Sequence, residues 1–184
     1  MHRRVSFLVV LALVLSALLA GCGSSTSSPE QVATDYFGAL TTGDWATVAK
    51  LQSSRGGAFE PPTADEERIV KALTGRMAFD LGEAEVQGDE ATIAVDVTMP
   101  DMDRLAVAFM DEVLPLAFEA AFSEDVSEEQ LQLMVEEKFV EILNDPGLAL
   151  STYEGVVRLV KEAGGWKVLT VDGLDMSGDV FDGF

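Results

Sequence analysis

The sequence predicts a single α+β domain built on a curved antiparallel sheet. Three observations support this prediction. Apolar residues recur at helical spacing early in the chain, two separate stretches alternate apolar and polar residues around tight turns, and a long helical segment lies between those stretches. Periods near 3.6 and two residues are the main sequence signals of helices and strands. Hairpins separated by helices favour an antiparallel sheet with helices on it, and we assign this domain to residues 29–171.

The domain begins with a helix marked by Ser28, Pro29 and Gln31. Serine is favoured at the N-cap and proline at the first helical position, and a glutamine three residues after the cap completes a capping box. The apolar residues of this helix share one face: Val32, Tyr36, Phe37 and Leu40. A second, short helix is expected after Asp44, and a third after the capping box at 63–66.

Two β-hairpins follow from the alternating stretches. The predicted strands are 77–81, 93–99, 153–162 and 166–171. Turn residues at 87–89 and 164–165 join them in pairs, which is a hairpin signal. Gly82 interrupts the first strand and is the expected position of a β-bulge.

A helical insertion of 47 residues, 101–147, separates the two hairpins. In its first part, 102–122, 15 of 21 residues are apolar, and Pro115 should kink or break the helix. Apart from Asp103 at the helix start, the polar residues of this part cluster with Pro115 within an arc of about 100°, so most of the circumference is apolar.

Such a helix should be covered on more than one side. We therefore expect 102–122 to lie between the sheet and a second helix at 131–143, with Phe109, Val113 and Leu116 deeply buried. The helix pair would then close the open side of the sheet as a lid or plug.

The first 22 residues are typical of a secretory leader. Arg3 and Arg4 precede an apolar run, 7–20, that is too short to span a membrane. The tetrad at 19–22, Leu-Ala-Gly-Cys, resembles the lipobox of bacterial lipoproteins. The resemblance implies a signal peptide at 1–21, diacylglycerol on the Cys22 thiol, cleavage before that residue, and a flexible tether at 22–28. A secreted protein with a stray cysteine and an uncleaved anchor are the alternatives.

The predicted signal peptide and lipobox imply that the protein is located in the cell envelope. Its lipid would lie on the outer face of the cytoplasmic membrane, or in an outer membrane if the host has one. Cleavage leaves 163 residues with 10 basic and 32 acidic side chains, a net charge of −22. Such a charge repels nucleic-acid phosphates and anionic headgroups, so we expect no nucleic-acid partner and membrane contact through the lipid alone. An acidic tail, 172–184, ends the chain.

The mature chain lacks the usual nucleophilic and metal-binding side chains. The only histidine of the full sequence is His2, within the predicted signal peptide, and the only cysteine is Cys22, whose thiol would carry the lipid. Ser-His-Asp and Cys-His catalysis, His/Cys zinc sites and disulfides are thereby excluded. We expect no cofactor, no metal site and no catalytic residue, and hence a protein that is not an enzyme.

Both ends of the domain resemble the small cystatin-like, or nuclear-transport-factor-2-like, lipoproteins of bacteria. The stretch 29–40 followed by Gly43-Asp44-Trp45 is similar to their first two helices, and 156–162 followed by 165–169 to their final hairpin. The resemblance covers about half of the mature chain and implies a curved antiparallel sheet wrapped on a long helix as a cone that often holds a pocket. The long insertion departs from the shorter members.

Several bulky side chains are candidates for lining such a pocket. They are Trp45, Phe79, Phe109, Met110 and Phe118, with Phe122 and Met134 also available. Ordinary core packing is the competing interpretation at this spacing. Asp101 and Asp103 lie at a helix start and are interpreted as capping residues rather than calcium ligands. The tail carboxylates lack the spacing of a calcium loop: Asp172, Asp175, Asp179 and Asp182.

Three function classes stay open. The first is a binding module for a small apolar ligand or peptide, and the second is an interaction or structural protein that uses the insertion. The third is an isomerase-like or dehydratase-like enzyme using Tyr36, Tyr153, Asp80 or Asp96, although Asp96 is expected to face water, beside Arg158. An enclosed cavity would favour the first class, and a filled interior with an exposed apolar patch on the insertion would favour the second.

Overall fold

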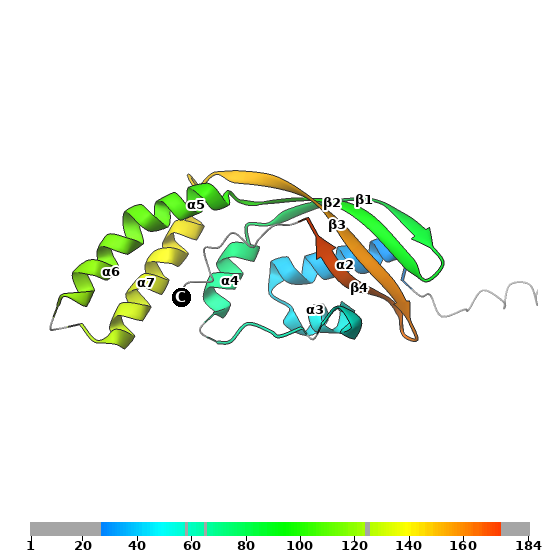
Figure 1. The fold of residues 1–184 in the computed structure, drawn as a ribbon, viewed down its shortest axis with the longest axis horizontal. Helices are drawn as coiled ribbons and strands as arrows, with labels where there is room; N and C mark the ends of the chain where they lie inside the picture. The colour runs from blue at the N-terminus through cyan, green and yellow to red at the C-terminus, as the bar shows by residue number, and fades with distance from the viewer. Residues whose placement is uncertain (1–26, 58, 65, 124–125, 174–184) are drawn as a thin grey trace, which may run out of the picture.

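The computed structural model describes residues 27–173 except 58, 65, 124 and 125 (Figure 1). The predicted signal peptide, Cys22 and the tail from 174 onward lie outside the described residues. The predicted fold class is confirmed: a curved four-stranded antiparallel sheet lies on N-terminal helices, and a helical insertion separates its two hairpins.

The N-terminal helices are α2 (Pro29–Thr42), α3 (Trp45–Leu51) and α4 (Glu67–Thr74). The strands are β1 (Ala78–Gln87), β2 (Glu90–Pro100), β3 (Leu150–Glu162) and β4 (Gly165–Asp172). The insertion consists of α5 (Met102–Ala108), a π-helical turn (Phe109–Val113), α6 (Leu114–Ala121) and α7 (Glu128–Asn144).

The sheet follows the chain order β1-β2-β3-β4, with every neighbouring pair antiparallel. The bulge expected at Gly82 is confirmed, since the β1–β2 register shifts between Leu81 and Ala84. β2 alternates as predicted, with Ile93, Val95 and Val97 buried. Asp96 is exposed on the opposite face.

Helix α2 packs on the buried face of the sheet and fills most of it. Phe37, only 1% exposed, stacks on Phe79 of β1 with ring centroids 5.2 Å apart. The Ser28 hydroxyl caps α2 by accepting the Gln31 N–H. The predicted capping box does not close there, because the Gln31 amide donates instead to Asp35 at 2.8 Å.

Helix α4 connects the sheet core to the insertion. The predicted capping box at 63–66 is present in the turn before α4: the Glu66 carboxylate accepts the Thr63 N–H at 2.8 Å, and the Thr63 hydroxyl accepts the Glu66 N–H at 3.4 Å. Glu66, the residue directly before α4, makes no side-chain cap hydrogen bond of its own to the helix. Leu73 of α4 packs against both buried clusters, the one under the sheet and the one inside the insertion, as does Met102.

The insertion does not form the expected lid. Figure 1 shows α5, α6 and α7 beyond one end of the sheet, as a two-helix arm. Val113 is buried in the arm, but Phe109 and Leu116 are only half-buried. The prediction was wrong because α2 and α3 already cover the sheet's buried face, with side chains such as Phe37 and Val48. The arm (102–144) therefore has cover on one side only.

Pro115 does not break the arm. The π-helical turn precedes it, and the N–H of Leu114 donates to the Phe109 carbonyl five residues back. Pro115 then occupies the start of α6, where its missing N–H costs little. The helix thus continues from Met102 to Ala121.

Two polar contacts fix the arm where it joins the sheet. The Arg76 guanidinium donates to the Leu143, Asp145 and Leu148 carbonyls at 2.9, 2.7 and 3.2 Å, at the C-terminal end of α7. At the start of α5, the Asp101 carboxylate accepts the Arg104 N–H at 2.9 Å and the Ser151 hydroxyl at 2.5 Å. The predicted capping role of Asp101 is confirmed.

Within the described residues, no helix combines the length and apolar character needed to cross a membrane.

Candidate functional site

The residues predicted to line a pocket lie in three separate places. Trp45 and Phe79 pack against the sheet core, and Trp45 stacks on Phe59 with centroids 6.3 Å apart. Phe109 packs inside the arm, edge-on to Phe139 at 5.7 Å. Met110 and Phe118 are exposed on the arm's surface. The five residues therefore do not converge on one space.

Two surface depressions lined by described residues both open to solvent. One, of about 220 Å³, lies on the outer face of the sheet beside the β-bulge, between Asp80 and Asp96. The other, of about 390 Å³, lies between the α5–π segment and the C-terminal end of α7. It is lined by Ala108, Glu112, Glu141, Ile142, Asn144, Asp145 and Leu148. Both have carboxylates on their walls.

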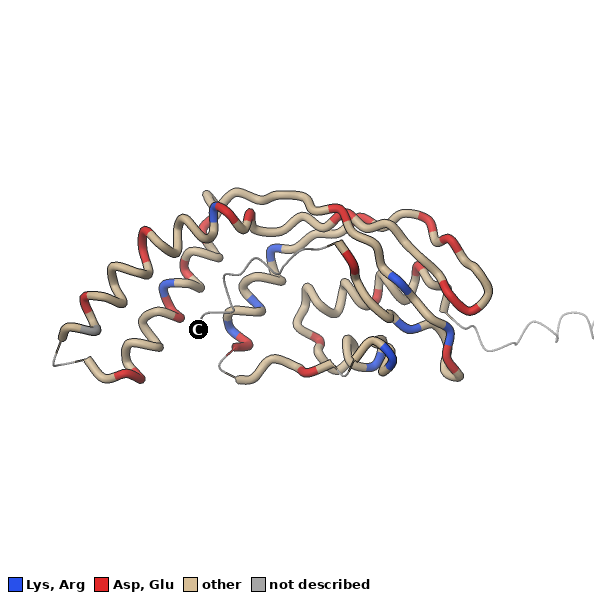
Figure 2. Tube along the Cα trace, viewed as in Figure 1, with Lys and Arg blue, Asp and Glu red and all other residues tan. Residues whose placement is uncertain are grey.

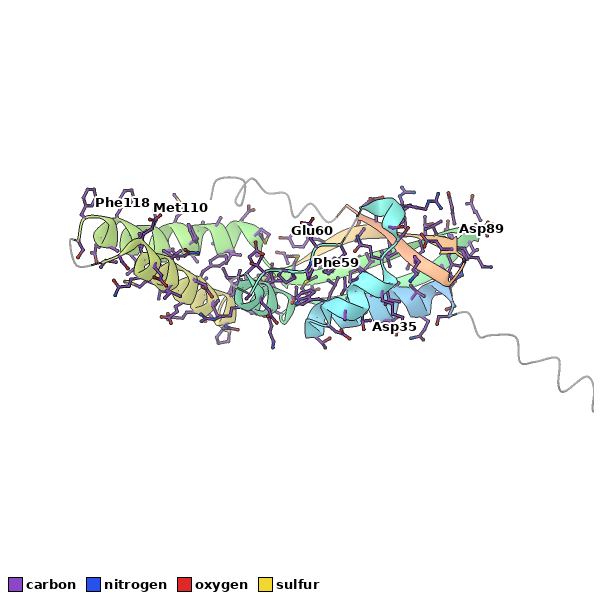
Figure 3. The ribbon with its side chains drawn as sticks, turned by 90° about the horizontal axis from the view of Figure 1, so that it is seen from below. Asp35, Phe59, Glu60, Asp89, Met110 and Phe118 are labelled. Carbon is purple, nitrogen blue, oxygen red and sulfur yellow. The ribbon has the colours of Figure 1, made fainter. Side chains whose placement is uncertain are left out.

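The arm instead presents a row of exposed apolar side chains. Val107, Met110, Phe118 and Phe122 have exposed fractions of 54, 57, 58 and 85%. Figure 3 shows Met110 and Phe118 on the side of the α5–α6 helix that faces away from α7. We call these four residues the outer stripe. Isolated exposed apolar residues are ordinary, but a contiguous row of large ones marks an interaction surface.

The arm is built so that the outer stripe cannot turn inward. The opposite side of the same helix carries Leu105 and Val113, which are buried against Phe139, Ile142 and Leu143 of α7. Rotating the helix to bury the outer stripe would expose those residues instead.

Carboxylates surround the outer stripe. Asp103, Asp111 and Glu119 are exposed on the same helix, and no ion pair to them is present among the described residues. Figure 2 shows acidic residues along the whole arm and few basic ones.

One lysine is held between the arm's two helices. Lys138 pairs with Glu112 at 2.9 Å and with Glu141 at 3.2 Å. The hydrogen bond to Glu112, followed by that to Glu141, raises the pKa of Lys138. This charge is therefore already engaged and does not neutralise the outer stripe's acidic border.

The residues considered for enzymatic chemistry are not gathered into one site. Burial raises the pKa of Tyr36, whose hydroxyl lies 3.5 Å from the Gln52 amide oxygen. The Tyr153 hydroxyl accepts the Met102 N–H at 3.3 Å. Asp80 and Asp96 are paired across strands on the exposed face of the sheet.

Asp96 was expected beside Arg158, and that placement is wrong. Asp96 lies opposite Glu154 in the sheet register, whereas Arg158 donates to Asp172 at 2.5 Å. This hydrogen bond lowers the pKa of Asp172. No group of three or more His, Cys, Asp or Glu side chains in the described part of the chain is arranged to hold a metal ion.

Comparison with protein-family models gives no match, and comparison with curated protein sequences also gives none. Among solved structures, the chain is similar to a "putative ketosteroid isomerase" from Shewanella frigidimarina, with 14% identity over 80% of this chain and 95% of that one, at a TM-score of 0.42. It is also similar to a "putative lipoprotein" from Bacillus subtilis, with 16% identity over 84% of this chain, at a TM-score of 0.43. The match spans half of the Bacillus subtilis protein.

The sequence contained a signal for the outer stripe that we interpreted differently. The broad apolar arc of 102–122 is real, but a neighbour covers only half of it. Met110 and Phe118 were candidates for a pocket wall, and the structure places both on the surface.

Proposed function

We propose that this protein is a non-catalytic, lipid-anchored interaction protein of the cell envelope, and that it binds another protein through the outer stripe of its arm. The observation that carries the proposal is the exposure of Val107, Met110, Phe118 and Phe122 in one row. Burying such side chains contributes about 25 cal/mol per Å² of apolar surface, so a partner gains substantially from covering them.

The arm's position in the fold supports this role. The sheet core is closed by α2 and α3, and the arm projects from one end of the sheet (Figure 1). A segment whose inner side has its own small core around Val113 and Leu143 is stable enough to present a surface. Protein interfaces commonly centre on such apolar and aromatic side chains with a polar rim.

A small apolar ligand is less well supported. A ligand pocket usually buries most of its ligand in a concave, mainly apolar space. Both depressions described above are open and lined in part by carboxylates. The side chains considered for proton transfer also lie apart, and non-catalytic binding therefore remains our proposal.

The proposed localisation in the cell envelope rests on the sequence. The tetrad at 19–22 resembles a lipobox, and the short tether before Pro29 would keep the domain close to the membrane. A lipid of two acyl chains gives firm anchoring, which an acidic domain cannot obtain from headgroup contacts.

Site-specific photocrosslinking in the native host tests the proposed interface. A photoreactive amino acid replaces Phe118 in one variant and Val86 of β1 in a matched control, because Val86 is 52% exposed but lies outside the arm. We expect a discrete cross-linked protein species from position 118 and none from position 86. Equal cross-linking at both positions, or none at 118, contradicts the proposal.

A further inference from the structure

We infer that the partner of the outer stripe is an amphipathic helix of another protein, with an apolar stripe bordered by Lys or Arg. This inference rests on the proposed function and names the chemistry of the partner. Its support is the linear shape of the outer stripe and the charge of the arm around it.

The outer stripe runs along the α5–α6 helix and ends just after it, at Phe122. Val107 and Phe122 are 15 residues apart, which is about 22 Å along a helix axis. In a regular helix, apolar positions with this spacing would rotate by about 60° around the axis. The π-helical turn at Phe109–Val113 winds more slowly, counteracts this drift and keeps the row aligned. A row of side chains along one helix matches another helix laid alongside it.

The negative charge of the arm favours basic residues on either side of the partner's apolar stripe. Residues 102–144 contain 11 acidic and two basic side chains, a net charge of −9. One of the two cations, Lys138, is already paired with Glu112 and Glu141. Asp103, Asp111 and Glu119 beside the outer stripe are thus available to Lys or Arg on a partner. Complementary charges of this kind set specificity and association rate.

The same charge disfavours three other occupants. A second copy would bring two acidic arms together, and like charges across an interface are unfavourable. The chain's own residues 174–184 carry Asp175, Asp179 and Asp182 and no basic residue. An anionic bilayer surface would repel the arm for the same reason.

Designed peptides test the partner's chemistry on the full-length chain, purified in a mild non-ionic detergent. Two fluorescein-labelled amphipathic helical peptides share one leucine stripe, and their border positions are either all Lys or all Glu. We expect the Lys peptide to bind about tenfold tighter or more than the Glu peptide, with affinity falling as salt rises. Empty micelles provide the background. Equal affinity for the two peptides overturns the inference.

Two pairs of variants locate the binding. Met110→Asp with Phe118→Asp should weaken Lys-peptide binding by about tenfold or more, while Val86→Asp should change it by less than about twofold.

Asp111→Lys with Glu119→Lys should reverse the preference toward the Glu peptide. The control pair, Asp35→Lys with Asp89→Lys, makes the same charge change outside the arm, on α2 and at the far end of the sheet (Figure 3). A similar response in both charge variants would mean a non-specific field and would overturn the inference.

Each competing occupant has its own result. Sedimentation that shows a dimer abolished by Phe118→Asp identifies a second copy. Lys-peptide affinity that rises at least tenfold on removal of 174–184 identifies the tail as the occupant. Binding to phosphatidylglycerol vesicles that is lost in the same aspartate variants identifies the bilayer. Any of these overturns the helix inference.

The inference and the proposed function can also fail separately. Cross-links at position 118 without Lys-peptide binding overturn only the inference, whereas the absence of both overturns the two together.

Discussion

Arg76 is the residue on which the arm's attachment most depends. Its guanidinium satisfies three carbonyls, those of Leu143, Asp145 and Leu148, around the end of α7. A cation at a helix C-terminus is also favoured by the helix dipole. Hydrogen bonds to charged groups contribute about 1.5–3 kcal/mol each, less where solvent reaches them.

We expect Arg76→Ala to lower the free energy of unfolding by about 2 kcal/mol and to increase amide exchange in the arm more than in β2 and β3. Arg76→Lys is the matched control, because it keeps the charge but replaces the planar guanidinium, whose spread N–H groups reach three carbonyls, with a compact ammonium group. Hydrogen–deuterium exchange by mass spectrometry measures both effects. Uniform exchange across arm and sheet would show that Arg76 does not secure the arm in particular.

Asp101 gives the junction a dependence on pH. Its hydrogen bond from Ser151, followed by that from the Arg104 N–H, lowers its pKa below the ordinary value of 3.8. A carboxylate with a lowered folded-state pKa contributes stability that is present above that ordinary value and is lost as pH falls through the folded-state pKa.

Asparagine caps helices about as well as aspartate but does not titrate in this range. We therefore expect Asp101→Asn to be less stable than wild type at pH 7, with the difference shrinking below about pH 4. Urea denaturation at a series of pH values measures this difference. A stability gap that stays constant from pH 7 to pH 3 would contradict the assignment.

At the scale of elements, the protein has two cores of unequal burial. Phe37 lies fully buried under the sheet, whereas Phe109 is half-buried in the arm against Phe139. Phe37→Ala should therefore lower the free energy of unfolding by about 3–5 kcal/mol. Phe109→Ala should cost about 1–3 kcal/mol, because the site can relax toward solvent.

Denaturant unfolding followed by circular dichroism gives both values. Equal losses for the two variants would indicate that the arm core is as well packed as the sheet core.

The elements themselves were largely predictable from the sequence because their signals are local. The caps at Ser28 and Thr63, the bulge at Gly82 and the alternation of β2 depend on neighbours within a few residues. The position of the arm was not predictable. A wide apolar arc on a helix indicates that the helix is covered, but it does not indicate which other element covers it. Under the sheet, the space was already occupied by Phe37, Val48 and their neighbours.

The candidate site was missed for a related reason. Met110 and Phe118 have the same residue types as pocket or core residues, and only the tertiary arrangement shows that they are exposed. The π-helical turn between Met102 and Ala121 changes which side chains share a face of this helix. It depends on hydrogen bonds that no short sequence pattern predicts.

At the scale of the whole molecule, the start of α2 and the arm lie at opposite ends (Figure 1). Helix α2 begins at the end of the sheet distant from the arm (Figure 1). A lipid attached a few residues before Ser28 would therefore hold that end near the bilayer and leave the arm free for a protein partner. The negative charge of the domain acts in the same direction, since it disfavours lying flat on an anionic surface.

This arrangement requires that Cys22 carries the lipid. We expect wild-type protein to incorporate a fatty-acid analogue in the native host and Cys22→Ser to incorporate none, because no other cysteine is present to accept the diacylglycerol. His2→Ala, a change within the predicted signal peptide that leaves the lipobox intact, is the control and should label normally. Label that persists in Cys22→Ser would refute the predicted lipobox. The proposed binding surface on the arm would then stand, but the proposed membrane localisation would not.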